Sequence, residues 1–197
     1  NAALAAGQYD AALARYREAS VEAPESSEIP YNQATAFYHQ GEYTNAAAEF
    51  RKVAGTTRDT HLAARSHFGL GNCSFRESER QRDSDLQKSL AACEESIRHY
   101  QDALKLDPTY REAAENIEVA RLTLKAILDA IKKQQEEQQK RQQQQKQQQE
   151  QLEQIIREQE QNRQASDKLG QQQQQATNAP DTQAAADQLA QKQEELR

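Results

Sequence analysis

The chain has 197 residues and a formal net charge of −6, with six Gly, four Pro and no Met or Trp. Acidic and basic side chains are mixed along it, so it lacks the basic stripe that nucleic acid or an anionic membrane would need. No apolar run approaches the roughly 20 residues of a spanning helix, so we expect no membrane insertion within these residues. No segment shows strand-like alternation, which predicts an all-α protein.

The composition of the chain changes near Ile131. Up to that residue the chain has the mixture of Tyr, Phe, Leu and Ala found in globular domains, and beyond it Gln dominates, with scattered Lys, Arg and Glu. We therefore predict a folded domain over residues 1–131, a Gln-rich helical extension over residues 132–169 and a tail over residues 170–197.

Two stretches repeat one another at a period of 34 residues. The first begins at Gly7 and reads GQYDAALARYREA, and the second begins at Gly41 and reads GEYTNAAAEFRKV. Self-similarity at this period is typical of stacked helix–turn–helix units, in which the glycine makes the turn. The Ala at the sixth position of each stretch, Ala12 or Ala46, lets two helices approach closely.

The repeat predicts the first helices in chain order. Residues 1–6 are the end of one helix, and Tyr9–Glu22 forms its partner. Ser27, as an N-cap, and Pro30, in the first turn, open the next helix, which extends to Gln40.

The third unit departs from the repeat. Ser78 stands where a turn glycine is expected, and the second helix of this unit resumes late. We therefore predict an insert near residues 78–92. Ser84 and Gln87 form a capping box that starts the late helix.

A capping box of Thr109 and Glu112 opens the last helix. Its apolar residues recur at a spacing of three and four, and the same register continues into the Gln-rich segment. These residues are Ile117, Ala120, Leu124, Ile127, Ile131, Leu152, Ile155 and Leu169. The pattern predicts one helix from about Thr109 to Leu169, ended by Gly170.

The Gln-rich part of this helix has two interpretations. It is either a solvated spacer or a helix that pairs with a partner through Leu152, Ile155 and Ile156, a short cluster that pairs weakly by itself. After it, residues 171–180 are expected to be disordered, and Asp181–Leu196 to form one short helix.

Each unit carries a further set of recurring residues. Unit one has Gly7, Tyr9, Ala12, Tyr16 and Pro24; unit two has Gly41, Tyr43, Ala46 and Phe50; unit three has Leu70-Gly71, Tyr100, Ala103 and Pro108. This pattern resembles the tetratricopeptide repeat (TPR) over about residues 1–131. The resemblance implies a superhelix of about three and a half repeats with a long C-terminal capping helix. It also implies a non-catalytic adaptor or scaffold that binds proteins.

A narrower resemblance concerns the order of the segments. The chain carries, in order, the segment FGLGN, an insert, the segment IRHYQDALKLDPTYREAAENIEVA and a Gln/Lys/Glu tail. This order resembles that of the TPR proteins of Bat-type (aerotolerance) operons. That resemblance implies a scaffold in the bacterial periplasm or envelope, beside von Willebrand A-domain proteins and MoxR-type ATPases; a cytoplasmic location stays open. Because the sequence begins at Asn1 and has no Met, we expect its start upstream, where a signal peptide or anchor could stand.

Stacked units of this kind form a concave groove from their first helices, which binds extended peptides or partner helices. The residues expected to face it are Tyr31, Asn32, Thr35, Tyr38 and His39 from unit two, and Arg65, Phe68, Asn72, Phe75 and Arg76 from unit three. Aromatic, Asn and Arg side chains together suit a peptide with an acidic group, because Arg pairs with a carboxylate and Asn bonds the peptide backbone.

Two other functions stay open. The first is a co-chaperone that holds acidic C-terminal peptides in a carboxylate clamp, since Asn1, Asn32 and Arg65 fall at three clamp positions. Gly69, however, stands where the clamp has a basic residue. The second is a structural protein that oligomerises through its Gln-rich helix.

The only two cysteines, Cys73 and Cys93, are both expected in the core. Counted from Ser84, they lie roughly level on antiparallel helices. They are therefore either two buried thiols or, in an oxidising compartment, a disulfide contributing about 3 kcal/mol by loop closure.

Nothing in the sequence predicts catalysis, a cofactor or a metal. No combination of nucleophile, base and acid is apparent, and Gly69-Leu70-Gly71 resembles a phosphate loop only superficially, because it lies inside a helix with no strand before it. The histidines show no metal-ligand spacing along the chain; they are His39, His61, His67 and His99.

Overall fold

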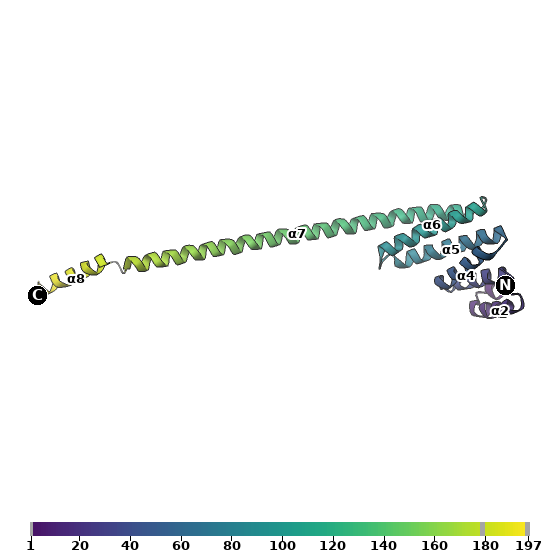
Figure 1. The fold of residues 1–197 in the computed structure, drawn as a ribbon, viewed down its shortest axis with the longest axis horizontal. Helices are drawn as coiled ribbons and strands as arrows, with labels where there is room; N and C mark the ends of the chain where they lie inside the picture. The colour runs from purple at the N-terminus through teal and green to yellow at the C-terminus, as the bar shows by residue number, and fades with distance from the viewer. Residues whose placement is uncertain (1, 178–179, 196–197) are drawn as a thin grey trace. The chain divides into compact units, whose positions relative to one another are not determined.

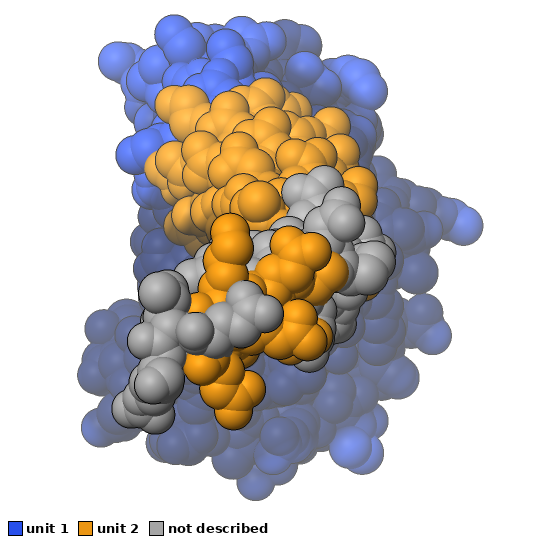
Figure 2. Space-filling model, turned by 90° about the vertical axis from the view of Figure 1, so that its left-hand side faces the viewer, with its two compact units in different colours: residues 1–136 blue, residues 137–197 orange. Residues whose placement is uncertain are grey.

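The structure is a computed structural model that describes residues 2–177 and 180–195. Every regular element in these ranges is a helix, which confirms the predicted all-α class (Figure 1). The chain divides into two compact units, residues 1–136 and residues 137–197 (Figure 2). Among the described helices, none combines the length and the apolar character needed to cross a membrane.

Unit 1 is a stack of antiparallel helix pairs. Its helices are α1 (Ala2–Ala5), α2 (Tyr9–Glu22), α3 (Glu28–His39), α4 (Tyr43–Thr56), α5 (Thr60–Gln81), α6 (Leu86–Leu106) and the first part of α7 (Arg111–Thr177). From α1 to α5, each helix makes its main contacts with the next helix in sequence, as in repeat proteins whose units contact only their neighbours.

The two turn glycines adopt the conformation that the repeat requires. Gly7 has a φ of 73° and Gly41 a φ of 80°, in the left-handed region where a side chain would be strained. Gly41 also donates its backbone N–H to Tyr38 O at 3.0 Å, which closes the turn between α3 and α4. The period of 34 residues in the sequence therefore reflects a backbone requirement.

Two other glycines on α5 let aromatic rings lie directly against the helix backbone. A Cβ placed on Gly69 would lie 2.6 Å from Cζ of Phe50, and a Cβ on Gly71 would overlap the ring of Tyr100. Phe50 comes from α4 and Tyr100 from α6, so α5 is packed closely from both neighbours. Gly69 and Gly71 therefore serve the close packing of α5 against its two neighbouring helices.

The apolar core of unit 1 consists of three clusters along the stack. Ala3, Ala12 and Tyr16 form the first; Ala34, Ala46, Phe50, Leu70 and Cys73 form the second; Cys93, Tyr100, Ala103, Ala113, Ile117, Ala120, Ile127 and Ile131 form the third. Ala12 and Ala46 are 2% and 0% exposed, so the small residues of the repeat do lie at helix contacts.

The insert in the third unit lengthens the α5–α6 pair. Ser78, at the position of the missing turn glycine, is an ordinary helical residue, because α5 continues to Gln81. The added turns are joined by two buried serines: Ser78 Oγ donates to Ser89 O at 2.8 Å, and Ser89 Oγ donates to Ser78 O at 2.8 Å. Each of these buried hydroxyls thus has a hydrogen-bond partner within the helix contact.

Both capping boxes predicted at the starts of α6 and α7 are wrong. Asp85, not Ser84, caps α6, and its carboxylate accepts the backbone N–H groups of Gln87 and Lys88. At the start of α7, the Thr109 hydroxyl donates to Asp107 Oδ1 at 2.6 Å instead of capping the helix. In both places a neighbouring Asp accepts the hydrogen bonds, since an ionised carboxylate is the stronger acceptor.

The end of α7 also differs from the prediction. The helix continues through Gly170 to Thr177, so residues 171–177 are helical and not disordered. Gly in a helix costs only about 1 kcal/mol relative to Ala, which a long helix tolerates. Helix α8 (Pro180–Glu195) takes the place of the predicted short helix, and Leu196 and residues 178–179 lie outside the described residues.

The two cysteines do not form the disulfide considered from the sequence. Both are free and buried, but they belong to different clusters, because Cys73 faces Phe50 on α4 whereas Cys93 faces α7. The thiol of Cys93 donates to Ala120 O at 3.3 Å. The spacing from Ser84 placed the two residues level along the helices but did not show which way each one faces.

Candidate protein-binding groove

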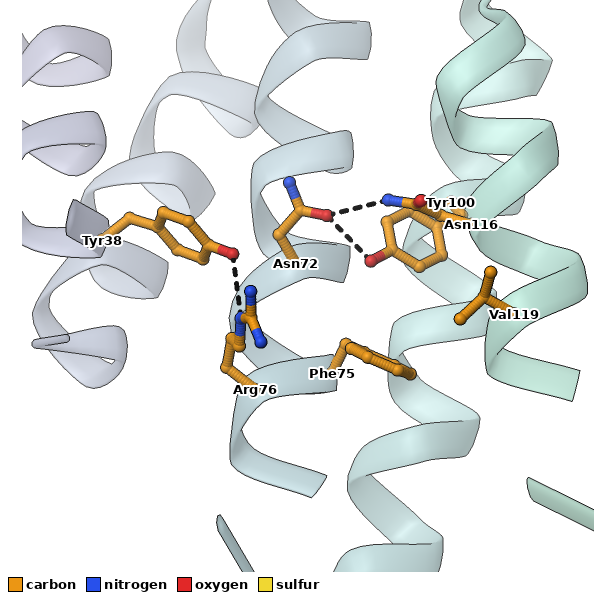
Figure 3. A pocket seen from close by; sticks show the side chains of 7 residues that line it. All are labelled: Tyr38, Asn72, Phe75, Arg76, Tyr100, Asn116 and Val119. Atoms are coloured by element: carbon orange, nitrogen blue, oxygen red, sulfur yellow. Dashed lines mark hydrogen bonds between the residues drawn. The ribbon is translucent and has the colours of Figure 1, made fainter. Parts of the chain in front are cut away.

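Four of the predicted groove residues surround one pocket in unit 1. The pocket has a volume of about 210 Å³ and is bordered by α3, α5, α6 and α7 (Figure 3). Its lining residues are Tyr38, Asn72, Phe75, Arg76, Tyr100, Asn116 and Val119. The first four of these were predicted from the repeat, and the last three were not.

Asn72 is the polar centre of the pocket. Its Oδ1 accepts a hydrogen bond from the Tyr100 hydroxyl at 2.8 Å and another from Asn116 Nδ2 at 3.2 Å. Burial raises the pKa of Tyr100, so its hydroxyl stays protonated and donates. With Oδ1 fixed in this way, the amide Nδ2 of Asn72 points away from both partners (Figure 3) and forms no hydrogen bond within the described part of the chain. The site therefore holds one oriented donor.

Arg76 supplies a positive charge at the edge of the pocket. Its Nε donates to the Tyr38 hydroxyl at 3.3 Å, and its Nη1 pairs with Glu79 at 2.7 Å. The hydrogen bond to Tyr38 contributes most, and that to Glu79 next, to raising the pKa of Arg76 above its ordinary value, so the guanidinium stays charged. The Arg76 side chain is 49% exposed, and its Nη2 is available to donate a hydrogen bond to a carboxylate of a partner.

The apolar wall of the pocket comes from Phe75 and Val119. Phe75 is half-buried, and Val119 on α7 is 51% exposed. No further helix pair covers this face of α7 within unit 1, so Val119 stays open to an apolar side chain of a partner.

A second group of predicted residues lies on the same helices but is used for packing. The guanidinium of Arg65 lies 4.4 Å from the centre of the Tyr31 ring, a cation–π contact. The ring of Phe68 is 4.9 Å from that of Tyr110 and 5.7 Å from that of Tyr100. Phe68 therefore belongs to the contact with α6 and with Tyr110, the residue before α7, more than to a free surface.

The remaining predicted residues are not brought into the pocket. Thr35 donates its hydroxyl to Tyr31 O within α3, and His39 stacks on Tyr9 of α2 at 5.4 Å. Asn32 is half-buried on α3 and does not line the pocket.

The carboxylate clamp lacks one of its basic side chains for a steric reason. Asn1, a proposed clamp residue, lies outside the described residues. Arg65 is present, but Gly69 faces the Phe50 ring so closely that no side chain fits there. The fold thus uses this position for packing between α4 and α5.

The repeat contained a signal for the residues that we did not predict. Asn116 follows Pro108 by eight residues, as Asn32 follows Pro24, and Val119 follows Pro108 by eleven, as Thr35 follows Pro24. The start of α7 therefore occupies the place of the first helix of a fourth unit. Treating it as a cap led us to leave its inner face out of the groove.

Residues 1–61 match the family model described as tetratricopeptide repeat. No curated protein matches the chain. The match covers the first repeats and, with the helix pairs that follow them, supports a TPR protein with an all-α repeat fold and a long C-terminal helix. Repeats of this family generally mediate protein–protein interactions and are typically not catalytic.

Proposed function

We propose that this protein is a non-catalytic adaptor that binds a peptide or a partner helix in the groove around Asn72. The observation that carries the proposal is the composition of the pocket. It combines an oriented amide donor on Asn72, a charged guanidinium on Arg76 and an apolar wall at Phe75 and Val119. A few convergent polar groups beside apolar surface are typical of a binding site.

The partner segment is expected to carry an acidic residue next to an apolar one. Its carboxylate would pair with Arg76 Nη2, and a backbone carbonyl would accept from Asn72 Nδ2. An apolar side chain would lie against Phe75 and Val119, where it removes half-exposed apolar surface from water.

For the cellular context, we propose a scaffold of the bacterial periplasm or envelope. Its partners there would be von Willebrand A-domain proteins and MoxR-type ATPases. The support for this is the order of segments in the sequence, FGLGN, an insert, the stretch around Asp107-Pro108 and a Gln-rich tail, which resembles the Bat-type proteins. A von Willebrand A-domain partner offers a direct test, because it should compete for the groove with peptides that are selected to bind there.

The groove is tested by selecting peptides from a random displayed library on the full chain. Selected peptides are expected to contain an acidic and an apolar residue and to bind Arg76→Gln and Val119→Asp about 10–100-fold more weakly, since a hydrogen bond to a charged group contributes about 1.5–3 kcal/mol. Arg80→Gln is the matched control. Arg80 is also an exposed arginine of α5 paired with one carboxylate, that of Glu77, but it lies outside the pocket.

Two results would contradict the proposal. Peptides that bind all variants equally would show that the groove is not the site. Peptides that lose affinity for Arg80→Gln as much as for Arg76→Gln would show attraction to positive charge in general.

A second candidate function is self-association through α7. Leu152, Ile155 and Ile156 in unit 2 are 58%, 52% and 52% exposed in the Gln-rich part of α7. Sedimentation equilibrium of the full chain is expected to show weak self-association that Ile155→Glu abolishes. A wild-type chain that stays monomeric would refute this role without affecting the groove.

A further inference from the structure

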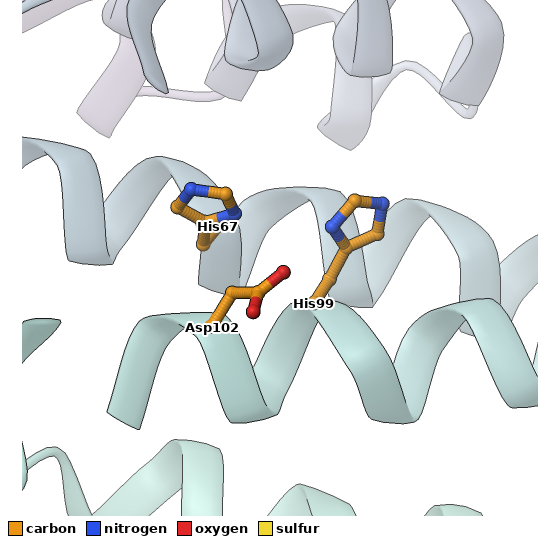
Figure 4. Close-up of side chains that lie close together, drawn as sticks. All are labelled: His67, His99 and Asp102. Carbon is orange, nitrogen blue, oxygen red and sulfur yellow. The ribbon is translucent and has the colours of Figure 1, made fainter. Parts of the chain in front are cut away.

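Two histidines and an aspartate meet on the side of unit 1 away from the groove. His67 lies on α5, and His99 and Asp102 lie one turn apart on α6 (Figure 4). One ligand atom from each of the three side chains lies within 4.8 Å of the others. Spacing along the chain predicted no metal ligands among the histidines; the antiparallel packing of α5 and α6 creates the cluster.

The imidazoles of this cluster have unsatisfied nitrogens. Nδ1 of His67 and both ring nitrogens of His99 are buried and form no hydrogen bond within the described residues. A buried polar atom without a partner costs roughly 1–3 kcal/mol, and such atoms are few in folded proteins. Three such atoms lie in two neighbouring rings whose centroids are 6.1 Å apart, so the pair offers unpaired nitrogens to a ligand.

We propose that His67, His99 and Asp102 bind a Zn²⁺ ion, with water in the fourth position. Two imidazoles and a carboxylate form one of the common donor sets for zinc, whereas calcium and magnesium prefer oxygen donors alone. Nothing else in the described chain satisfies these nitrogens, and a metal ion would satisfy one on each ring.

The geometry requires only a small closure. Donor atoms around a tetrahedral zinc lie about 3.3 Å apart, given bonds of about 2.0–2.1 Å, so the three groups need to approach by no more than about 1.5 Å. Rotation of the side chains on two fixed helices provides this. Asp102 also pairs with Lys105 at 2.7 Å, but that lysine is 74% exposed, and a surface pair of this kind is weak enough to yield to a metal.

Neighbouring charges fit this assignment. Glu95 Oε1 lies 3.7 Å from His99 Nε2, so the carboxylate can hold that nitrogen while Nδ1 binds the metal, as outer-shell carboxylates do for zinc-bound histidines. Figure 4 shows one ring nitrogen of His99 directed towards the other two side chains and the second directed away. Two cations near the site oppose the metal: Arg51, which acts electrostatically on His99, and Lys105, which pairs with Asp102.

The site would join α5 to α6 from behind the groove. At 3.6 residues per turn, His67 is about 160° round α5 from the midpoint of Asn72 and Arg76. The metal would therefore fix the helix pair that carries Asn72 and Tyr100 without contacting a peptide in the groove. Its role would be to hold these two helices at one spacing.

The test uses the full chain, freed of metal by chelation and dialysis. Zn²⁺ binding is measured by calorimetry and by metal analysis after equilibrium dialysis, and Co²⁺ replaces Zn²⁺ for absorption spectroscopy. We expect one Zn²⁺ per chain and the visible bands of tetrahedral Co²⁺. His67→Ala, His99→Ala and Asp102→Asn should each weaken binding at least about 100-fold, because even an outer-shell partner accounts for about 10–100-fold.

His61→Ala is the matched control, since it removes an exposed imidazole of the same helix and leaves the cluster intact. Asp102→Asn keeps the size of its side chain on a partly exposed position, so it tests the site even if a histidine variant unfolds. The proposal would be overturned if the chain bound no metal. It would also be overturned if the three ligand variants bound Zn²⁺ as tightly as His61→Ala does. Binding that Asp102→Asn leaves unchanged would overturn the three-ligand site.

Discussion

Replacing Gly71 by Ala should destabilise the repeat domain, although the same change in most helices is stabilising. A helical Gly→Ala change normally contributes up to about 1 kcal/mol. At Gly71, however, the new Cβ would overlap the ring of Tyr100, which is 1% exposed and bonded to Asn72. Overpacking of this kind costs about 1–3 kcal/mol, and a lost hydrogen bond about 1 kcal/mol. The free energy of unfolding should therefore fall by about 1–3 kcal/mol.

Urea unfolding followed by tyrosine fluorescence is the suitable measurement. All seven tyrosines lie between Tyr9 and Tyr110, so this signal reports the repeat domain and not the Gln-rich helix. A loss of 2 kcal/mol would lower the midpoint by roughly 1 M for a slope of about 2 kcal/mol per M. Gly55→Ala is the matched control: Gly55 is helical with no atom within 4 Å of a new Cβ, and its replacement should raise the midpoint. If Gly71→Ala raised the midpoint as Gly55→Ala does, the close Tyr100 contact would be refuted.

Three further predictions concern single groups. Tyr100→Phe should lower the free energy of unfolding by about 1 kcal/mol, because Asn72 loses one of its two donors; an unchanged urea midpoint would contradict this. The backbone N–H of Lys88 chiefly lowers the pKa of Asp85. The Asp85 cap should therefore stabilise the fold above the ordinary pKa of about 3.8, and this stabilisation should be lost as the pH falls through the lowered pKa. In an acid titration, the free energy of unfolding of Asp85→Ala should then fall less steeply below pH 3.8 than that of the wild-type chain. Burial raises the pKa of Cys73 to about 12 and also raises the pKa of Cys93. At about pH 8, both thiols of the native chain should therefore react with a disulfide reagent far more slowly than after unfolding. Rapid reaction of the native chain would contradict their burial.

The parts of the fold that repeat could be predicted from the sequence. Gly7 and Gly41 marked two turns because only glycine adopts a positive φ there without strain, and Ala12 and Ala46 marked helix contacts because larger side chains would not fit. These requirements act on single residues, so they leave a visible pattern.

Helix ends and side-chain directions were harder to predict. Ser84 and Thr109 fit the capping box, but a nearby Asp accepted the hydrogen bonds instead, since several candidate caps within two residues compete. Gly170 has the residue type of a helix end and yet lies inside α7. For Cys73 and Cys93, position along the helices was predictable, whereas rotation about the axes depended on the packing of α4 and α7.

The pocket was predicted in part for a related reason. Tyr38, Asn72, Phe75 and Arg76 followed from the repeat frame, but Asn116 and Val119 belong to a helix that the insert shifts out of that frame. The histidine cluster left no local signal, because His67 and His99 are 32 residues apart and approach only through the pairing of α5 with α6. A contact between two helices is not a property of either segment alone.

One backbone contact links the two surfaces of the α5–α6 pair. Because Gly71 has no side chain, Tyr100 lies directly against α5, and its hydroxyl reaches Asn72 at 2.8 Å on the groove side. The residue before it, His99, is thereby held with its ring centroid 6.1 Å from that of His67 on the opposite side. A methyl group at position 71 would push α6 outward and lengthen both contacts. Gly71→Ala should therefore weaken Zn²⁺ binding and peptide binding together, whereas Arg76→Gln should affect peptide binding alone.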